Sequence, residues 1–417
     1  MDIYSRMLQE RFNEIQNHKE KLNTLDHFLL LKEIMKYLPN HTGLLNQISI
    51  QLLRWGLLGE ALQILDKSLS LDGNKQAHEI MNTFSNPPMP STVTLELSTV
   101  CNLRCPLCYT GARTLKRMGR YMKYKDFCNI WKEIRDHTKM LIIVGQGETF
   151  LNKDVYRILD SIQGASYVYI DTNGNIPLNH QKIISTGVDE IVFSIDGINQ
   201  ETYAIYRQKG KFDIAVDNLR SMAKVKKQMK SQKPKIVFKY VVFKHTEEFI
   251  EQARQISVSL GADDFRIEPC TFEPPFGFEA LKKFMPTGDQ WRRIEAIDFE
   301  NGTIWPIKER YSSRCSVPFS NIYITVDGDV GPCCGVDQNR IPILGNLLNQ
   351  SLMDIWHSEI ARSFRMKVLR NRHEERSCDH CSYPMNHLGR CFDGILVEAN
   401  HYIIPDTATR IYDIESN

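Results

Sequence analysis

The sequence predicts an α/β protein built on a partial (β/α)6 TIM-like barrel, with an all-helical segment before it and a small cysteine-bearing domain after it. Three observations support this prediction. Leucines recur at helical spacing up to about residue 85, three prolines interrupt the pattern in residues 85–91, and six β-branched runs then alternate with amphipathic stretches. The length of 417 residues suggests two or three domains.

The composition is that of a soluble globular protein, with 42% hydrophobic and 24% charged residues. A formal net charge of +2 gives no strong field that would attract nucleic acid or an anionic membrane. Residues 1–16 carry charges throughout and lack the apolar core of a secretory signal. No apolar run approaches the roughly 20 residues that a membrane span needs. We therefore expect a cytoplasmic protein with neither a nucleic acid nor a membrane as partner.

The first part of the chain is predicted to be a helical extension over residues 1–85, followed by a linker at 86–91. Residues 46–72 resemble one tetratricopeptide unit, with Gly56 at the tight helix contact and Ala61 at the small-residue position. Such repeats normally occur in arrays of three or more, so a plain helical extension is the alternative.

Six runs rich in β-branched residues predict the strands of the barrel over residues 92–300. Because helical stretches separate them, the strands are expected to be parallel with right-handed crossovers. Six units are fewer than the eight of a closed barrel, and chemistry is expected at the carboxyl ends of the strands. The predicted strands are residues 92–98, 140–145, 167–173, 190–196, 236–243 and 264–270.

Residues 301–417 are predicted to form a small, loop-rich C-terminal domain. A hairpin is expected within residues 321–334, where Asp327 and Gly328 form a turn signal between β-rich runs. Such a segment has little core of its own, so a bound cluster is expected to hold it together.

The chain contains eleven cysteines, which gather at short spacings. A disulfide framework fits poorly, because the chain is large and shows no export signal. In a reducing compartment, such groups are more often ligands of a metal or cluster.

The first group is Cys101, Cys105 and Cys108, spaced C-x3-C-x2-C directly after the first predicted strand. Three thiolates on one loop can hold three irons of a 4Fe–4S cluster and leave the fourth iron open to an outside ligand. A three-cysteine zinc site is the alternative.

This motif resembles the signature of the radical S-adenosylmethionine (SAM) superfamily. The resemblance implies that SAM binds the open iron and that the turns after the next strands contact SAM. Leu107 stands where the family usually has an aromatic residue, and Gln146 and Thr149 depart from the usual G-G-E-P turn. The residues that match the family's SAM-binding motifs are Gly147, Glu148, Thr172, Asn173, Ser194, Asp196 and Arg207.

By this resemblance Glu148 contacts the SAM amino group, and Arg207 pairs with the SAM carboxylate, to which a guanidinium is suited. Ser194 and Asp196 are implied to lie near the ribose and carboxylate of SAM.

The second group offers four thiolates, from Cys315, Cys333, Cys378 and Cys381. Its surroundings resemble the SPASM domain, an auxiliary-cluster extension of many radical SAM enzymes. Full SPASM domains use about seven cysteines for two clusters. With six cysteines after residue 301, this chain is expected to hold one auxiliary 4Fe–4S cluster. A zinc site is the alternative.

Four further cysteines have less certain roles. Cys334 and Cys391 could replace one of these ligands, serve a second cluster or remain free thiols. Cys128 falls inside an amphipathic helix and is expected to be a small core residue. Cys270 ends the sixth strand, so it is expected to face the barrel mouth, where a substrate-side role is open.

The resemblance implies an enzyme that reductively cleaves SAM and uses the 5′-deoxyadenosyl radical to abstract hydrogen from its substrate. A one-electron reductant such as flavodoxin or ferredoxin would be needed. We favour a peptide or protein maturase; a dehydrogenase or rearrangement enzyme for a sugar or cyclitol and a non-catalytic zinc-binding adaptor are the alternatives. A general base is not identified, because Asp327, Asp329 and Asp337 are equivalent candidates.

Overall fold

The computed structural model describes residues 40–54, 58–71, 75–87, 89–162, 167–270, 278–291, 294–298, 303–306, 315, 317–333, 342–371, 375, 378, 396–398 and 401–403. Contacts divide the chain into two compact units. One comprises residues 1–87, 314–316 and 384–417, and the other comprises residues 88–313 and 317–383. None of the helices in these described ranges combines the length and apolar character that crossing a bilayer requires.

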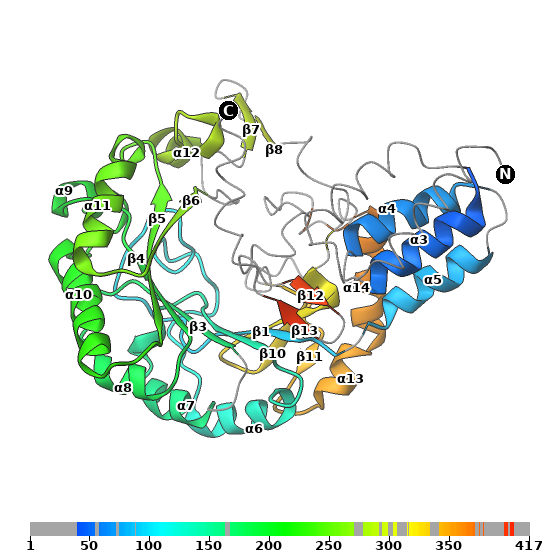
Figure 1. The fold of residues 1–417 in the computed structure, drawn as a ribbon, viewed down its shortest axis with the longest axis horizontal. Helices are drawn as coiled ribbons and strands as arrows, with labels where there is room; N and C mark the ends of the chain where they lie inside the picture. The colour runs from blue at the N-terminus through cyan, green and yellow to red at the C-terminus, as the bar shows by residue number, and fades with distance from the viewer. Residues whose placement is uncertain are drawn as a thin grey trace. The chain divides into compact units, whose positions relative to one another are not determined.

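In its described residues the first unit has three helices, α3 (Thr42–Arg54), α4 (Leu58–Leu69) and α5 (Lys75–Ser85), shown in blue in Figure 1. Apolar residues three and four apart place one face of each helix toward its neighbours. The buried residues include Leu44, Leu45, Ile48, Ile64, Leu65, Ala77 and Ile80.

A buried polar link joins these helices. Asn46 of α3 is 1% exposed, and its Oδ1 accepts a hydrogen bond of 2.7 Å from Ser68 of α4. Its Nδ2 donates to Gln76 of α5 at 3.0 Å. The predicted roles of Gly56 and of the Ala61 side chain in a tetratricopeptide unit lie outside the described residues.

The second unit is built on a sheet in the order β11-β10-β9-β1-β2-β3-β4-β5-β6. Strands β1 to β6 are all parallel and follow the chain order, which confirms the predicted six-stranded partial barrel. Their bounds are β1 Thr92–Leu95, β2 Met140–Ile143, β3 Tyr167–Thr172, β4 Glu190–Ser194, β5 Lys235–Val242, β6 Asp264–Pro269, β9 Asn321–Ile324, β10 Asp329–Gly331 and β11 Gly345–Asn346.

Two antiparallel pairs stand apart from this sheet. They are β7 (Ile294–Asp298) with β8 (Thr303–Pro306), and β12 (Leu396–Glu398) with β13 (His401–Ile403).

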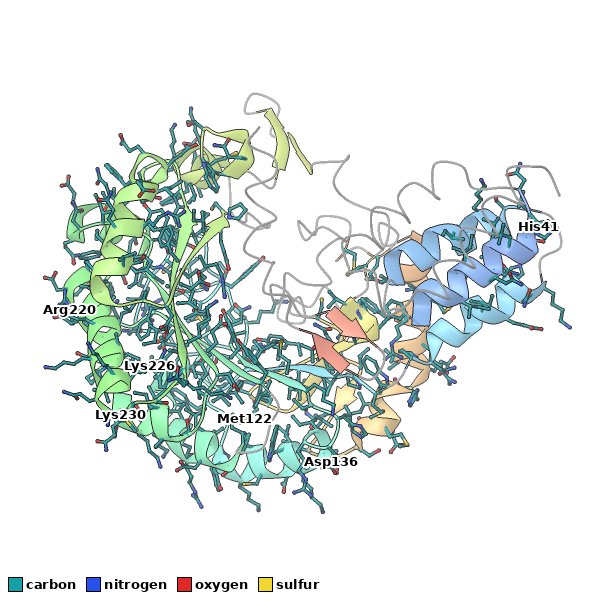
Figure 2. All side chains as sticks on the ribbon, viewed as in Figure 1. His41, Met122, Asp136, Arg220, Lys226 and Lys230 are labelled. Carbon is teal, nitrogen blue, oxygen red and sulfur yellow. The ribbon has the colours of Figure 1, made fainter. Side chains whose placement is uncertain are left out.

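Helices that connect the barrel strands lie along the outer side of the curved sheet (Figure 1). Their charged side chains project away from it, as Arg220 and Lys230 do along and just after α10 (Figure 2). The helices of this unit are α6 Tyr124–Ile134, α7 Val155–Ser161, α8 His180–Ser185, α9 Gln200–Tyr206, α10 Phe212–Gln228, α11 Ile250–Leu260, α12 Phe278–Phe284, α13 Leu352–Trp356 and α14 Glu359–Asn371.

The two faces of the barrel sheet differ in chemistry. Side chains that alternate toward the helices are apolar and form the main core, for example Leu95 on β1 and Phe238 on β5. Side chains on the opposite, inner face include charged pairs, such as Glu190 of β4 with Arg266 of β6 at 2.7 Å. Closed barrels fill their interior with branched apolar residues. Toward the carboxyl ends of the strands, the polar residues of this face instead suit the lining of a ligand site.

The C-terminal hairpin continues the barrel sheet. β9 pairs with β1 in parallel, with Thr92 opposite Asn321 and Leu95 opposite Ile324. Gly328 has φ +83° at the predicted turn between β9 and β10, which confirms the Asp-Gly turn signal.

Apolar residues of this segment join the main core of the barrel, so they pack as part of that core. These are Ile322, Ile324, Val326, Val330, Leu344, Leu347, Leu352, Ile355, Trp356 and Ala361.

The prediction for Cys128 is wrong. Phe127, Ile130 and Ile134 form the buried face of α6, whereas Cys128 is exposed. One helical position turns the side-chain direction by about 100°, so the residue beside Phe127 points away from the sheet.

Truncating the barrel core should destabilise the protein far more than truncating its surface. Phe238 is fully buried, so Phe238→Ala should cost about 3–5 kcal/mol of unfolding free energy. Val258 on α11 is 72% exposed, so Val258→Ala should stay within about 0.5 kcal/mol of the parent. Urea denaturation followed by circular dichroism measures both, and similar losses in the two variants would contradict this packing.

Candidate active site

The loop after β1 brings three cysteines together in a tight turn. Cys105 is 6% exposed, and Cys101 and Cys108 are half-buried. The Cys108 amide donates to the Cys105 carbonyl at 3.2 Å, and the Leu103 amide donates to Cys101 Sγ at 3.4 Å. A Cβ on Gly111 would lie 2.3 Å from the Cys105 carbonyl oxygen, so glycine lets the chain return past this cysteine.

These thiols need a nearby positive charge to ionise. Burial raises the pKa of Cys101 to about 11 and that of Cys105 to about 12. The thiolate is the form that binds a metal, and iron ions supply the missing charge. The donor set and its burial therefore fit an iron–sulfur cluster.

Among the residues that the structure describes, no three His, Cys, Asp or Glu side chains converge as the ligands of a single ion do. The cysteines of a cubane differ in this respect, because each binds its own iron.

Glu148 forms hydrogen bonds with two other predicted SAM-binding residues, Thr172 and Asn173. It is 3% exposed, and its Oε1 accepts hydrogen bonds from Thr172 Oγ1 at 2.8 Å and from the Phe150 amide at 3.2 Å. Its Oε2 accepts one from the Asn173 amide at 2.7 Å. Burial raises the pKa of Glu148 to about 7, although these three donors oppose the shift.

This cluster of residues contacts the cysteine loop. Asn173 Nδ2 donates to Asn102 Oδ1 at 2.9 Å and lies 3.7 Å from Cys101 Sγ. The Glu148 amide donates to the Val100 carbonyl at 2.8 Å. A Cβ on Gly147 would lie 2.5 Å from the Ser98 carbonyl oxygen, which explains the glycine there. Cys101 and the turns after β2 and β3 thus lie next to one another at the carboxyl ends of the strands.

Arg207 and Asp196 form a buried ion pair. The Arg207 Nε donates to Asp196 Oδ2 at 2.5 Å, and the Val241 amide donates to Asp196 Oδ1 at 2.8 Å. Asp196 is fully buried, and the Arg207 side chain is 14% exposed. The arginine implied to pair with the SAM carboxylate is therefore oriented by a carboxylate of this chain.

Ser194 precedes Asp196 by two residues and contacts a second ion pair. Its Oγ donates to Asp171 Oδ1 at 2.8 Å, and the other Asp171 oxygen forms an ion pair with Lys239 Nζ. These groups lie at the carboxyl ends of β3, β4 and β5, where chemistry was predicted.

An apolar cluster borders the cysteine loop. Leu107 packs with Phe243, Phe284, Met285 and the buried Cys270. Tyr206 packs on this cluster, with its ring centroid 3.9 Å from that of Phe243. Leu107 thus supplies the apolar contact at the position where the family usually has an aromatic residue.

The second cysteine group is described in part. Cys333 follows β10, and Cys315, Cys333 and Cys378 are each half-buried. Cys381, Cys334 and Cys391 lie outside the described residues.

Two of the three candidate bases have partners in the protein. Asp327 forms an ion pair of 2.6 Å with Arg120, and Asp329 accepts a hydrogen bond of 2.8 Å from Asn346. Asp337 lies outside the described residues.

Glu96 is a site residue that the sequence analysis did not single out. It follows β1, is fully buried and forms an ion pair with Arg117 from the stretch after the cysteines. The signal was present, since a single carboxylate interrupts the apolar and hydroxyl residues of TVTLELS. Charged residues are rarely buried without a partner.

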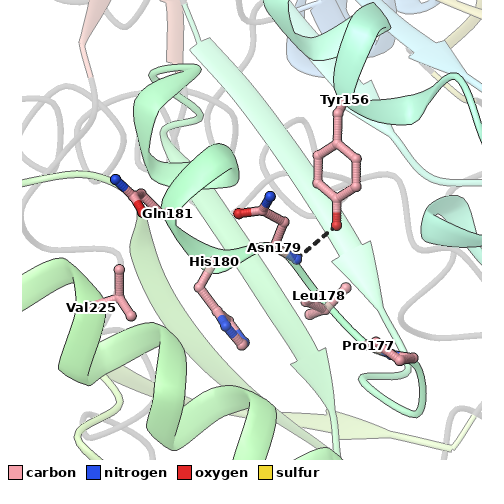
Figure 3. A pocket seen from close by; sticks show the side chains of 7 residues that line it. All are labelled: Tyr156, Pro177, Leu178, Asn179, His180, Gln181 and Val225. Atoms are coloured by element: carbon pink, nitrogen blue, oxygen red, sulfur yellow. Dashed lines mark hydrogen bonds between the residues drawn. The ribbon is translucent and has the colours of Figure 1, made fainter.

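A groove of about 570 Å³ lies apart from these residues, among the helices α7, α8 and α10 (Figure 3). Tyr156 Oη accepts a hydrogen bond of 2.8 Å from the Asn179 amide at one side of it. It contains no predicted site residue. The lining residues are Tyr156, Pro177, Leu178, Asn179, His180, Gln181 and Val225.

The raised pKa of Glu148 predicts how stability depends on pH in protein free of iron and SAM. Between its ordinary value of 4.5 and about 7, the folded chain holds a proton that the unfolded chain releases. The contribution of Glu148 to stability should therefore fall by about 3 kcal/mol as pH rises through this window. Urea denaturation of the parent and of Glu148→Gln, at both ends of the window, isolates this contribution. A constant difference between the two proteins would contradict it.

Comparisons with known proteins agree with this geometry. Residues 95–253 match the sequence profile of the radical SAM superfamily, and residues 315–382 match that of SPASM, an iron–sulfur cluster-binding domain. Over 343 residues the chain is 23% identical to the antilisterial bacteriocin subtilosin biosynthesis protein AlbA of Bacillus subtilis (strain 168). That similarity covers 78% of this chain and 72% of AlbA.

Solved structures share the fold. Streptococcus suis SuiB bound to S-adenosylmethionine has a TM-score of 0.52 at 16% identity, over 72% of this chain and 76% of SuiB. SuiB bound to precursor peptide SuiA has a TM-score of 0.51 at 14% identity, over 78% of this chain and 87% of that SuiB chain. The solved structures show that the fold is shared, and the two family profiles identify a radical SAM domain and a SPASM domain in this chain, with a 4Fe–4S cluster that binds SAM and an auxiliary iron–sulfur site.

Proposed function

We propose that this enzyme is a peptide or protein maturase that cleaves SAM reductively and abstracts hydrogen from a side chain or backbone carbon of its substrate. The observation that carries the proposal is the contact between the three-cysteine loop and the Glu148, Thr172 and Asn173 cluster. This contact places a candidate cofactor-binding site beside the three thiols of the cysteine loop, at the carboxyl ends of the strands.

In this proposal Cys101, Cys105 and Cys108 hold the SAM-binding cluster, and Cys315, Cys333, Cys378 and Cys381 hold one auxiliary 4Fe–4S cluster. When bound, the first cluster supplies the single electron that splits SAM into methionine and a 5′-deoxyadenosyl radical. A protein reductant such as flavodoxin or ferredoxin is the proposed source of that electron.

The remaining predicted residues position SAM. Gly147 allows the backbone to approach, and Glu148 with Thr172 and Asn173 forms the polar corner for the amino group. Ser194, Asp196 and Arg207 form a second polar region for the ribose and carboxylate, where the Asp196 carboxylate fixes the guanidinium. The apolar cluster around Leu107 excludes water from this side of the loop.

The proposed substrate class rests on the relatives. AlbA is named for the biosynthesis of a bacteriocin, and SuiB is bound to a precursor peptide in one of its structures. The charged pair of Asp171 and Lys239 on the inner face of the barrel sheet supports a substrate that brings hydrogen-bonding groups, as a peptide does.

Replacing Cys105 should abolish SAM cleavage, because the cluster would lose one of three ligands. We expect anaerobically reconstituted protein to form 5′-deoxyadenosine only with a reductant, and Cys105→Ala to form none. Cys128→Ala is the matched control, since Cys128 is exposed on α6 and should keep full cleavage. Cleavage retained by Cys105→Ala would contradict the assigned loop, and colourless protein containing zinc would favour an adaptor.

Turnover with candidate substrates tests the maturase assignment. Peptides and sugars are incubated in parallel with the reconstituted protein, SAM and reductant, and products are identified by mass spectrometry. The proposal predicts a mass loss in a peptide that depends on SAM. Oxidation of a sugar or cyclitol, with every peptide unchanged, would contradict the peptide assignment while leaving SAM cleavage intact.

A further inference from the structure

Glu96 receives hydrogen bonds from four groups of the protein. Its Oε1 accepts from Arg117 Nη2, the Gln146 amide and Tyr323 Oη, each at 3.1 Å. Its Oε2 accepts from the Val326 amide at 3.1 Å and from Arg117 Nη1. Both carboxylate oxygens are thus fully engaged inside the protein.

The chemistry of this cluster requires a carboxylate. Each of the four groups is a donor, and an ionised carboxylate is a pure acceptor that can serve them all. Arg117, whose side chain is 15% exposed, supplies the compensating charge. A buried ion pair is tolerated when its remaining sites are satisfied by hydrogen bonds, as they are around Glu96.

The four donors come from three separate segments of the candidate active site. Arg117 belongs to the stretch after Cys108, and Gln146 immediately precedes Gly147 and Glu148. Tyr323 and Val326 belong to the hairpin that leads to Cys333.

The turn after β2 lies directly against this carboxylate. A Cβ on Gly145 would come within 2.5 Å of Glu96 Cγ, so even one methyl group would push the turn away. The second link between the cysteine loop and the hairpin, Arg120 with Asp327, is 53% and 35% exposed. Exposed pairs contribute little, which leaves Glu96 as the stronger connection.

We propose that Glu96 is a positioning residue that fixes the SAM-contacting turn and the auxiliary-cluster hairpin against the SAM-cluster loop. It acts through the Gln146 and Val326 amides and through Arg117, and it contacts neither cofactor itself. The proposal rests on the proposed function, because it assigns the turn to SAM and Cys333 to the auxiliary cluster.

Glu96→Gln tests this role with almost no change in volume. The amide keeps one acceptor oxygen but turns an NH2 group toward donors and leaves Arg117 without its charge partner. Glu190→Gln is the matched control, because Glu190 is the first residue of β4 and lies away from the carboxyl ends of the strands where the candidate site is. Glu190 is 6% exposed and accepts hydrogen bonds from Tyr167 Oη at 2.8 Å and from Arg266 Nη2 at 2.7 Å. It lies at the amino end of β4, whereas Glu96 follows the carboxyl end of β1.

Hydrogen exchange of the iron-free full chain gives the first measurement. In Glu96→Gln we expect exchange of the Gln146 and Val326 amides to rise at least about tenfold. Glu190→Gln should leave these two amides unchanged. Equal exchange in the parent and Glu96→Gln would overturn the proposal, and so would an equal rise in both variants.

The second measurement is the SAM-induced change in the electron paramagnetic resonance spectrum of reduced, reconstituted protein. Glu96→Gln should need about tenfold more SAM for the half-maximal change, and Glu190→Gln should match the parent. If Glu96→Gln does not fold, Tyr323→Phe removes one donor without changing charge, and a smaller shift in the same direction is expected. An unshifted Tyr323→Phe would then refute the role of Glu96. A parent protein that shows no SAM response would refute the proposed function instead.

Discussion

Parallel pairing on both sides of β1 is the constraint on which the candidate active site depends. β1 pairs with β2 on one side and with β9 on the other, and all three strands run in the same direction. Their following segments therefore emerge at one edge of the sheet. This arrangement brings the cysteine loop, the Glu148 turn and the turn of the C-terminal hairpin to neighbouring positions.

The polar groups of this edge are held mostly by other groups of the protein. Glu96, Glu148 and Asp196 are buried carboxylates. Glu96 and Glu148 each accept at least three hydrogen bonds from the chain, and Asp196 accepts two. Burying such charges carries a desolvation cost that burying apolar side chains of the same size does not. Their hydrogen-bond partners come from different loops, so these bonds hold the loops that bear the predicted cofactor ligands in a defined arrangement.

The local patterns of the sequence predicted much of this architecture. The six barrel strands follow from β-branched runs and helical spacers, and the Asp327-Gly328 turn follows from its dipeptide. The pairing of β9 with β1 could not be predicted, because it joins segments more than 200 residues apart and leaves no local periodicity. The Cys128 error arose because helix phase was not assigned residue by residue.

The candidate site shows the same division. Spacing located the three cysteines and the turns after the strands, since these motifs are short and contiguous. It did not reveal that Asp196 would hold Arg207, or that Glu96 would bind four donors, because each contact depends on how distant segments meet. The ligand set of the second cysteine group stays a prediction, and Cys381 lies outside the described residues.

The position of β9 has a consequence for the open side of the barrel. A partial barrel has two edge strands, and an unpaired edge strand is a template for pairing with another molecule. β9 pairs with the free side of β1, and β10 and the two-residue β11 continue the sheet beyond β9. A fragment that ended before residue 317 would leave the main-chain groups of Thr92–Leu95 unpaired on that side. The C-terminal hairpin therefore also protects the barrel sheet against pairing with a second molecule.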